Sequence, residues 1–278
     1  MWFLIALLAV LDAVGLWCTG LRLDHAALLP TLLPILGTGF LAWFYTYIRR
    51  DPRIAALTHL ISSSLAFTAV TMVLSYLSVT IGRPLVDQQL VAADHALGLD
   101  WQAMYAWVAA DPKLHLAMKY IYLSLVPQMV FLQLVLNFQG QTNRAWEMQG
   151  LFFAISLGCI VGSALWPAAG AFGYFHIDNG EPYVREFAAL RAGTLKIIGT
   201  GGVQGVIQFP SLHTALALLY IYIVRGHKYM FPVFLVLNLL VIASTPAIGG
   251  HHFADLWGGA ALALGIIALS RTRFIQRA

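Results

Sequence analysis

Runs of apolar residues recur along the whole chain and are separated by shorter polar segments. A helix needs about 20 apolar residues to cross the ~30 Å hydrocarbon core of a bilayer. Eight runs approach that length: Trp2 to Thr19, Pro30 to Ile48, Leu57 to Thr80, Leu114 to Phe138, Met148 to Ala171, Ser211 to Val224, Tyr229 to Ile248 and Ala254 to Ser270. The pattern predicts an all-α, polytopic membrane protein with about eight transmembrane helices.

The composition excludes a soluble globular domain. Of the 278 residues, 60% are hydrophobic and 10% are charged, and the mean hydropathy is +0.77. Soluble domains carry about 25% charged residues. Cys18 and Cys159 both fall inside apolar runs, which predicts neither a disulfide framework nor a multi-cysteine metal site. The first run lacks a basic leader and a small-residue cleavage site, so we expect a retained span rather than a signal peptide.

The distribution of basic residues predicts an orientation in the membrane. Lys and Arg collect in cytoplasmic loops. Eight alternating spans place nine of the 16 Lys and Arg residues on the face that holds both termini: Arg49, Arg50, Arg53, Arg144, Arg225, Lys228, Arg271, Arg273 and Arg277. Both termini are therefore expected in the cytoplasm, and the long connections 81–113 and 172–210 outside it. We attribute the formal charge of +4 to this orientation and expect no nucleic acid partner.

The connection 81–113 is expected to lie on the membrane surface. Pro84 suits the start of a helix, and apolar residues recur after it at helical spacing. Trp101, Tyr105 and Trp107 are typical of interfacial anchors. A packed linker without a function fits the same pattern, and no catalytic role is assigned to this segment.

Polar residues border the last three spans on the outer face, beginning with FPSLHT at residues 209–214. Pro210 can start a helix, and Ser211 and His213 would occupy its first turn. The unpaired amides and the dipole of a helix N-terminus favour an anion such as phosphate, and the Ser211 hydroxyl adds a donor. Taken alone, the motif is better explained as a serine cap beside a hydrogen-bonded interfacial histidine.

A second polar group is GGHHFADLWGG at residues 249–259. His251 and Asp255 are four residues apart, so on a helix they share a face and the carboxylate can accept a hydrogen bond from one imidazole nitrogen. The other nitrogen can then attack, as in the nucleophile and orienting acid of a catalytic triad. His252 points elsewhere on such a helix and is interpreted as an interfacial residue.

The two groups can meet because one span out and one span back separate His213 from His251. The run from Ser211 to Val224 has about 14 residues, or ~21 Å at helical rise, against a ~30 Å hydrocarbon core. The site is therefore expected to be recessed and open to the outer leaflet. That position suits a lipid whose polar head group is cut or transferred while its tails stay in the membrane.

Basic residues in the loop before Ser211 form a third group. Arg185, Arg191 and Lys196 can clamp phosphate oxygens. Exposed ion pairs with the acids of the same loop are the alternative interpretation.

The motif PSxH at 210–213, followed by HxxxD at 251–255, resembles the motifs of the type 2 phosphatidic acid phosphatase superfamily, which also includes vanadium haloperoxidases. The resemblance covers the chain from Leu57 onward, and residues 1–56 look like two added N-terminal transmembrane helices. It implies that residues 57–278 form a six-helix lipid phosphatase or phosphotransferase core. FPSLHT and the form GHHxxD look closest to the branch that contains inositol phosphorylceramide synthases and their bacterial relatives.

The resemblance also implies a role for each residue of the motifs. His251 attacks the phosphorus to form a phosphohistidine, and Asp255 orients this imidazole and supports its charge. His213 protonates the leaving oxygen. Ser211 and nearby backbone amides hold the phosphate.

The sequence departs from the family pattern at the cationic phosphate ligands. The Ser-Arg pair expected shortly before the second histidine reads Ser-Thr at 244–245. An Arg-Pro pair occurs at 83–84, but it precedes the wrong span and lacks the lysine that the family places before it. We therefore expect Arg191, and after it Lys196, to replace the missing ligands, with Arg83 as a further candidate.

Together these features predict an integral membrane phosphoesterase or phosphotransferase that acts on a lipid phosphate or phosphodiester and needs no metal or other cofactor. Water or an acceptor alcohol on a second lipid can take the phosphoryl group, so a hydrolase and an inositol phosphorylceramide synthase-like transferase both stay open. The expected location is a bacterial inner membrane with the site facing the periplasm. A Golgi-like membrane with a lumenal site satisfies the same charge argument.

Two further functions fit parts of the pattern. His213, His251 and Asp255 can be the three protein ligands of a catalytic zinc ion, which would make the protein a metal-dependent membrane hydrolase. Alternatively, histidine and aspartate at membrane depth can form the relay of a proton-coupled transporter. The lack of repeated halves in the sequence argues against the transporter.

Overall fold

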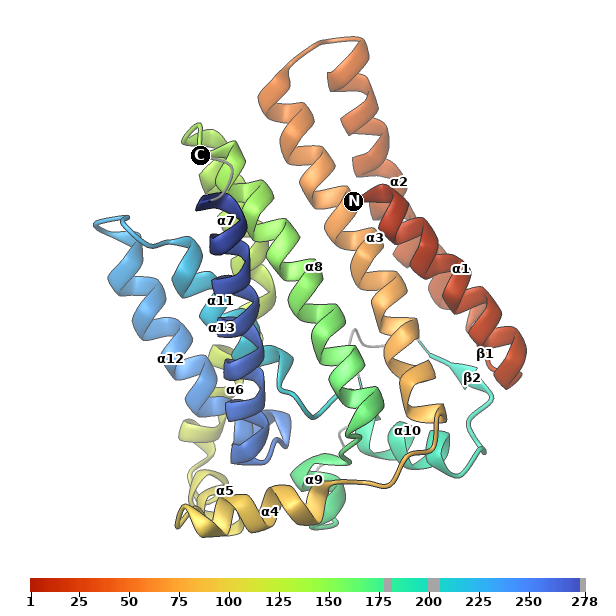
Figure 1. The fold of residues 1–278 in the computed structure, drawn as a ribbon, viewed down its shortest axis with the longest axis vertical. Helices are drawn as coiled ribbons and strands as arrows, with labels where there is room; N and C mark the ends of the chain where they lie inside the picture. The colour runs from red at the N-terminus through yellow and green to blue at the C-terminus, as the bar shows by residue number, and fades with distance from the viewer. Residues whose placement is uncertain (178–181, 200–205, 276–278) are drawn as a thin grey trace. The chain divides into compact units, whose positions relative to one another are not determined.

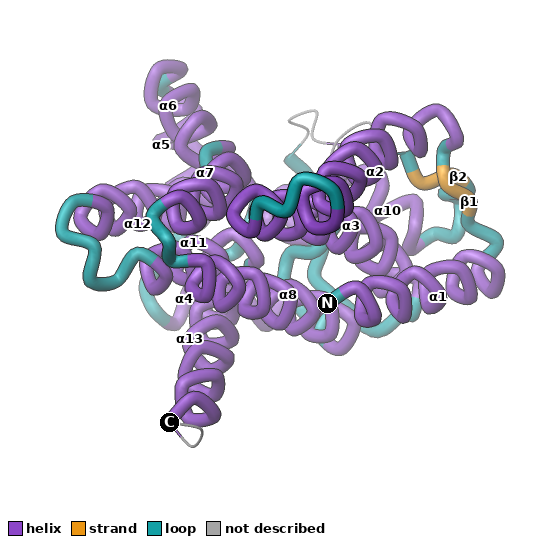
Figure 2. Tube along the Cα trace, turned by 90° about the horizontal axis from the view of Figure 1, so that it is seen from above, coloured by secondary structure: helices purple, strands orange, loops and turns teal. Residues whose placement is uncertain are grey.

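The structure, a computed structural model, describes residues 1–177, 182–199 and 206–275, without the side chains of residues 27 and 273–275. Arg277 and parts of the connection 172–210 lie outside the described residues. Helices make up most of the described chain, and the strands are one short pair (Figure 2). The elements are α1 (Trp2–Thr19), β1 (Arg22–Leu23), α2 (His25–Tyr47), α3 (Pro52–Thr80), α4 (Asp87–Ala96), α5 (Trp101–Ala110), α6 (Pro112–Leu123), α7 (Leu125–Phe138), α8 (Thr142–Leu165), α9 (Gly170–Tyr174), α10 (Pro182–Arg191), β2 (Ile197–Ile198), α11 (Leu212–Ile223), α12 (Met230–Gly249) and α13 (Phe253–Ile275).

The predicted class, an all-α polytopic membrane protein, is confirmed. Within the described residues, six segments are long and apolar enough to cross a membrane: α1, α2, α3, the stretch Thr142–Tyr174 that joins α8 to α9, α12 and α13. The helices α6 and α7 meet at a bend of 40° and make a seventh span if they cross together. The remaining predicted span corresponds to α11, which is apolar but has only 12 residues. The count of eight is therefore higher than length and composition support.

The chain forms two compact units that are each discontinuous in sequence. The first consists of Met1–Gly82, Met129–Phe153 and Arg185–Val206. The second consists of Arg83–Gln128, Ala154–Val184 and Ile207–Ala278. Both histidine motifs belong to the second unit. The sequence predicts two added helices in residues 1–56 and a family core in residues 57–278, and this division stays a prediction.

In the first unit, α3 packs against both α1 and α2 (Figure 1). A polar cluster from three helices lies among the apolar side chains: Gln133 donates to Ser64 Oγ and to Gln149 Oε1, both at 2.8 Å. Ser64 donates in turn to Gln149 Oε1 at 2.8 Å. Such hydrogen bonds between helices satisfy polar groups that hydrocarbon cannot solvate.

In the second unit, α11 packs against α12 and α13, and α4 packs against α13. α12 ends because Gly250 adopts the left-handed conformation, with φ of 67°. A Cβ at this position would lie 2.3 Å from Phe172 Cδ2, so both the conformation and the space require glycine. The chain then runs through the short link 250–252 before α13 begins at Phe253. This link carries His251 and His252.

The start of α11 and the first turns of α13 touch each other through their backbones. The Ser211 N–H donates to the Asp255 carbonyl oxygen at 3.0 Å. One turn further along α13, a Cβ on Gly259 would lie 2.2 Å from the Ser211 carbonyl oxygen. A backbone oxygen cannot move aside as a side chain can, so glycine at 259 permits this contact.

We expect Gly259→Ala to lower the unfolding temperature of the detergent-purified protein, because the added methyl group would push α13 away from α11. Gly265→Ala is the matched control, since a Cβ at Gly265 on the same helix meets nothing within 4 Å. On helix propensity alone, each change should stabilise by about 1 kcal/mol. Differential scanning fluorimetry measures the difference, and equal unfolding temperatures for the two variants would contradict the close contact.

Candidate active site

His213 and His251 lie close together in the second unit. Their ring centroids are 6.3 Å apart and the ring planes are inclined by 62°. A phosphorus atom needs about 3–3.5 Å to an attacking nitrogen, and a leaving oxygen needs about 2.7–3.2 Å to its proton donor. Two imidazoles at this separation are close enough for both to contact one phosphate group.

Asp255 holds one nitrogen of His251. The distance from His251 Nδ1 to Asp255 Oδ2 is 3.1 Å, and the residues are 2% and 0% exposed. When Asp255 is ionised it only accepts hydrogen bonds, so Nδ1 is then the donor and Nε2 is the nitrogen with an available lone pair. His251 precedes α13 instead of lying on it. The pair forms at the helix start, where Asp255 Oδ2 also accepts the His252 N–H at 2.9 Å.

Tyr122 is a residue of the site that the sequence analysis missed. Its Oη lies 3.2 Å from His213 Nδ1, and the two rings stack with centroids 4.1 Å apart. Tyr122 lies on α6, and 91 positions separate it from His213. No local motif marks it, because the contact depends on how α6 packs in this unit. The contact orients the ring of His213.

Ser211 is the N-cap of α11 and does not lie within its first turn. Its Oγ accepts the Thr214 N–H at 3.4 Å, and the residue is fully buried. A hydroxyl that accepts this bond can still donate its own proton to a phosphate oxygen. Ser211 can therefore cap α11 and bind a phosphate at the same time, so the two interpretations of this motif are compatible.

The interpretation of His252 as an interfacial residue is wrong. The side chain is 0% exposed, and its Nε2 lies 3.2 Å from Asp87 Oδ1. Asp87 belongs to α4, in the connection to which the sequence analysis assigned no catalytic role. The buried contact could not be foreseen because 165 positions separate the two residues.

The interfacial role predicted for Trp101 is also wrong. It is 2% exposed, donates through Nε1 to the Pro246 carbonyl at 3.1 Å, and stacks on Tyr105 and Phe175. Trp107 is 63% exposed and fits the predicted anchor. One side of the connection 81–113 is therefore buried against other elements of the second unit.

The two neighbouring histidines of the link have opposite electrostatic properties. Burial, and after it the charge of His252, lowers the pKa of His251 from 6.5 to about 3, although a hydrogen bond with the Gln208 backbone opposes the shift. Burial alone would also lower the pKa of His252. The hydrogen bond with Asp87 and the charges of the surrounding acids outweigh burial, so this pKa is raised. His251 is therefore harder to protonate than an ordinary imidazole, whereas His252 is easier to protonate.

The cationic candidates do not all lie in the same unit as the histidines. Arg83 does, in the exposed segment between α3 and α4. Arg191, the last residue of α10, and Lys196 belong to the first unit. Lys196 Nζ donates to the Gly193 carbonyl at 2.8 Å, and Lys196 helps to line a cavity of about 330 Å³ together with Arg22 of β1. The use of these three residues as phosphate ligands stays a prediction.

The positions where the family carries Ser-Arg are occupied by buried hydroxyls. Ser244 and Thr245 on α12 both donate to the Val241 carbonyl, each at 2.8 Å. These bonds stay within the helix backbone. Neither residue supplies the missing positive charge.

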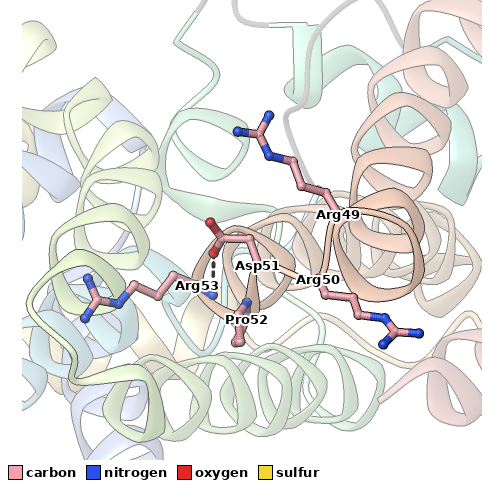
Figure 3. Close-up of a pocket in the computed structure, with 5 residues that line it drawn as sticks. All are labelled: Arg49, Arg50, Asp51, Pro52 and Arg53. Atoms are coloured by element: carbon pink, nitrogen blue, oxygen red, sulfur yellow. Dashed lines mark hydrogen bonds between the residues drawn. The ribbon is translucent and has the colours of Figure 1, made fainter.

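A second cavity, of about 460 Å³, lies at the turn between α2 and α3 and is lined by Arg49, Arg50, Asp51, Pro52 and Arg53. Asp51 caps α3 by accepting the Arg53 and Ile54 N–H groups, each at 3.1 Å. The three guanidinium groups point away from one another (Figure 3). They therefore do not form a single phosphate site.

The zinc alternative does not agree with the geometry. Among the residues that the structure describes, no three His, Cys, Asp or Glu side chains form a group that can hold a metal ion. In particular, His213, His251 and Asp255 do not form such a ligand set. The Nδ1 atoms of the two histidines face Tyr122 and Asp255 instead.

The fold and the site together define a helical membrane protein with a buried His–His–Asp arrangement. A family model described as the PAP2 superfamily matches residues 88–269. The match spans more than half of the chain and contains both histidine motifs, so the chain belongs to the PAP2 superfamily, as its resemblance to the type 2 phosphatidic acid phosphatases predicted. Membership supports a phosphatase-type phosphoesterase.

Neither the comparison with curated proteins nor that with solved structures finds a match. The match begins within α4, so the assignment of residues 57–87 to the family core stays a prediction.

We expect Tyr122→Phe to lower kcat about 10-fold, because His213 loses the partner that orients its ring for proton transfer. The stacking of the two rings is retained. Tyr120→Phe is the matched control on the same helix, since Tyr120 is 68% exposed. Release of phosphate from a lipid phosphate donor measures the effect, and equal kcat values for the two variants would rule out this role of Tyr122.

Proposed function

We propose that the protein transfers the phosphoryl or phosphodiester head group of a membrane lipid through a phosphohistidine on His251, at the extracytoplasmic face. The observation that carries this proposal is the pair of buried imidazoles 6.3 Å apart, one of which has its Nδ1 3.1 Å from a buried carboxylate. This arrangement offers a nucleophile, a group that supports its charge, and a proton donor for the leaving oxygen.

In the first step, Nε2 of neutral His251 attacks the phosphorus. The bond from phosphorus to the leaving oxygen breaks, its electron pair goes to that oxygen, and His213 in its protonated imidazolium form donates a proton to it and becomes neutral. The imidazole becomes positively charged as the new N–P bond forms, and Asp255 stabilises that charge across the 3.1 Å contact.

In the second step, the oxygen of water or of an alcohol attacks the phosphohistidine. His213, which lost its proton in the first step, takes the proton of this acceptor. The N–P bond breaks and its electron pair returns to His251. The cycle therefore balances without a net change in either histidine.

Preorganised dipoles stabilise the charge on the phosphate oxygens. The first amides of α11 and the Ser211 hydroxyl lie at the start of the helix that carries His213. A helix N-terminus attracts anions through its unpaired N–H groups and its dipole. Of the three cationic candidates, Arg83 belongs to the same unit as the histidines, and we assign it as a candidate phosphate ligand; the use of Arg191 and Lys196 stays a prediction from the sequence.

A lipid is the substrate that fits a site between membrane helices. α12 and α13, which flank the link 250–252, are both apolar enough to span a membrane. The basic residues on the face of both termini support a cytoplasmic location for the termini and a periplasmic site in a bacterial inner membrane. The FPSLHT and GHHxxD forms favour a head-group transferase like inositol phosphorylceramide synthase over a simple phosphatidate phosphatase.

The covalent route is tested with purified protein and radiolabelled phosphatidate, sphingolipid phosphate, polyprenyl pyrophosphate and phosphoinositide donors. We expect acid-labile, alkali-stable labelling of the wild type with at least one donor, and no labelling of His251→Ala. His213→Ala should lose turnover by about 100-fold or more, since it removes proton transfer. His25→Ala is the control, because His25 is exposed at the start of α2. Full turnover in both His251→Ala and His213→Ala would refute the proposal.

The same assay distinguishes hydrolase from transferase. A hydrolase releases inorganic phosphate from phosphatidate without an added alcohol. A transferase releases little until an acceptor such as a ceramide or another lipid alcohol is supplied, and then forms a new phospholipid.

The pH dependence follows from the lowered pKa of His251. The attacking form is the neutral imidazole, and with a pKa of about 3 instead of 6.5 it persists as the pH falls below 6. A plot of log kcat/KM against pH falls on the acid side where the nucleophile becomes protonated. We expect this acid limb to lie well below pH 6.5. A limb for this group at 6.5 or above would show that His251 is solvated in the working enzyme.

A further inference from the structure

α4 buries two carboxylates although most of its surface is exposed. The helix has 10 residues, and Asp87, Leu90 and Asp94 form its buried face, with exposed fractions of 3%, 8% and 2%. The two aspartates are two helical turns apart and so point in the same direction. Burying a charge is costly unless hydrogen bonds or opposite charges compensate it, so both carboxylates need partners.

Asp94 binds the beginning of α13. Its Oδ2 accepts the Phe253 N–H at 2.9 Å, and its Oδ1 accepts the Ala254 N–H at 2.7 Å. These are the first two amides of the helix, which have no partner within the helix itself. A carboxylate from another helix therefore caps α13 immediately before Asp255.

Asp87 binds the link that carries the nucleophile. Its Oδ1 lies 3.2 Å from His252 Nε2 and also accepts the Gly170 N–H at 2.9 Å. Its Oδ2 accepts the Ala169 N–H at 2.9 Å. The next amide, that of Ala171, donates to the Gly250 carbonyl at 2.6 Å. Asp87 thus holds the link directly through His252 and indirectly through the segment 169–171.

Asp255 depends on the backbone that these two carboxylates hold. Its Oδ2 receives His251 Nδ1 and the His252 N–H, whereas its Oδ1 has no hydrogen-bond partner among the described residues. Among the described residues, no hydrogen bond to Oδ1 therefore helps to orient this carboxylate. Its direction follows from the positions of residues 252–255, which Asp87 and Asp94 set.

We propose that Asp87 and Asp94 are positioning residues of the reaction: they clamp the link 250–252 and the first turn of α13 so that Asp255 aims His251 at the phosphorus. The proposal rests on the proposed function of His251. It gives the connection 81–113 a role in catalysis, which its amphipathic pattern does not reveal.

Asp87→Asn and Asp94→Asn test this role with almost no change in volume. Each wild-type carboxylate accepts hydrogen bonds with both oxygens, whereas an amide accepts with one and presents N–H donors on the other side. Asp100→Asn is the matched control. Asp100 caps α5 by accepting the Ala103 N–H at 3.0 Å in an exposed position, and asparagine caps about as well as aspartate.

We expect kcat per active site to fall about 10- to 100-fold in Asp87→Asn and Asp94→Asn, because a small misalignment of a nucleophile slows its reaction by that order. KM should change less than about threefold, since neither side chain lies on the substrate. Active sites are counted from the burst of phosphohistidine, so loss of folded protein does not mimic the effect. Asp100→Asn should retain the wild-type kcat.

The pH profile adds a signature that a loss of packing alone would not produce. The groups that face the two histidines of the link are Asp87, Asp94, Asp255 and His213. The charge of His252 lowers the pKa of its neighbour His251, and Asp87 sustains that charge. Asp87→Asn should therefore move the acid limb of kcat/KM upward by about one pH unit.

Hydrogen–deuterium exchange separates this proposal from the proposed function. In Asp94→Asn, the amides at the start of α13 should exchange faster than in the wild type and in Asp100→Asn. If this exchange and the kcat values of both variants match the wild type, the positioning role is overturned while the phosphohistidine stands. If the wild type forms no phosphohistidine with any donor, the proposed function fails. If the exchange of Asp94→Asn also matches the wild type, the positioning role fails as well.

Discussion

The contact between Asp255 and the His251 imidazole is the interaction on which the rest of the second unit depends. A carboxylate with 0% exposure needs hydrogen bonds to replace its water, and at Oδ2 of Asp255 an imidazole and a backbone amide do so. These donors come from the link 250–252, which Gly250 makes by ending α12 in a left-handed turn. The same turn brings the link within reach of Asp87. The same turn thus ends a membrane helix and places the residues of the candidate active site.

Charge in this region is arranged in two layers. The inner layer contains His213, His251 and Asp255, and burial keeps His251 neutral. The outer layer contains His252 with Asp87 and Asp94, where several carboxylates raise the pKa of one imidazole. The positive outer histidine disfavours protonation of its neighbour. Protonation of His252 therefore favours the neutral form of His251, the proposed nucleophile, and His252 does not need to touch the substrate to do so.

The family motifs are retained here without the family's arginine and lysine. Ser244 and Thr245 are committed to the backbone of α12, so nothing at those positions stabilises a phosphate. The start of α11 contributes amides, a dipole and the Ser211 hydroxyl, which bind an anion but bring no full charge. Membership of the PAP2 superfamily agrees with phosphoester chemistry, and the altered positions are one reason for the head-group transfer that we propose.

The sequence by itself determined the helical membrane class and the pairing of His251 with Asp255. Hydrocarbon offers no hydrogen bonds, so apolar runs of sufficient length have to form helices, and a four-residue spacing keeps two side chains near each other. Length and composition support six or seven of the eight predicted spans, because α11 is short, and the sequence misplaced His252 and Trp101, because burial depends on packing against other helices. Tyr122 and Asp94 meet their partners across 91 and 159 positions. Only the tertiary structure could decide these contacts, since they arise from the packing of helices far apart in the chain and leave no periodic or local pattern in the residues themselves.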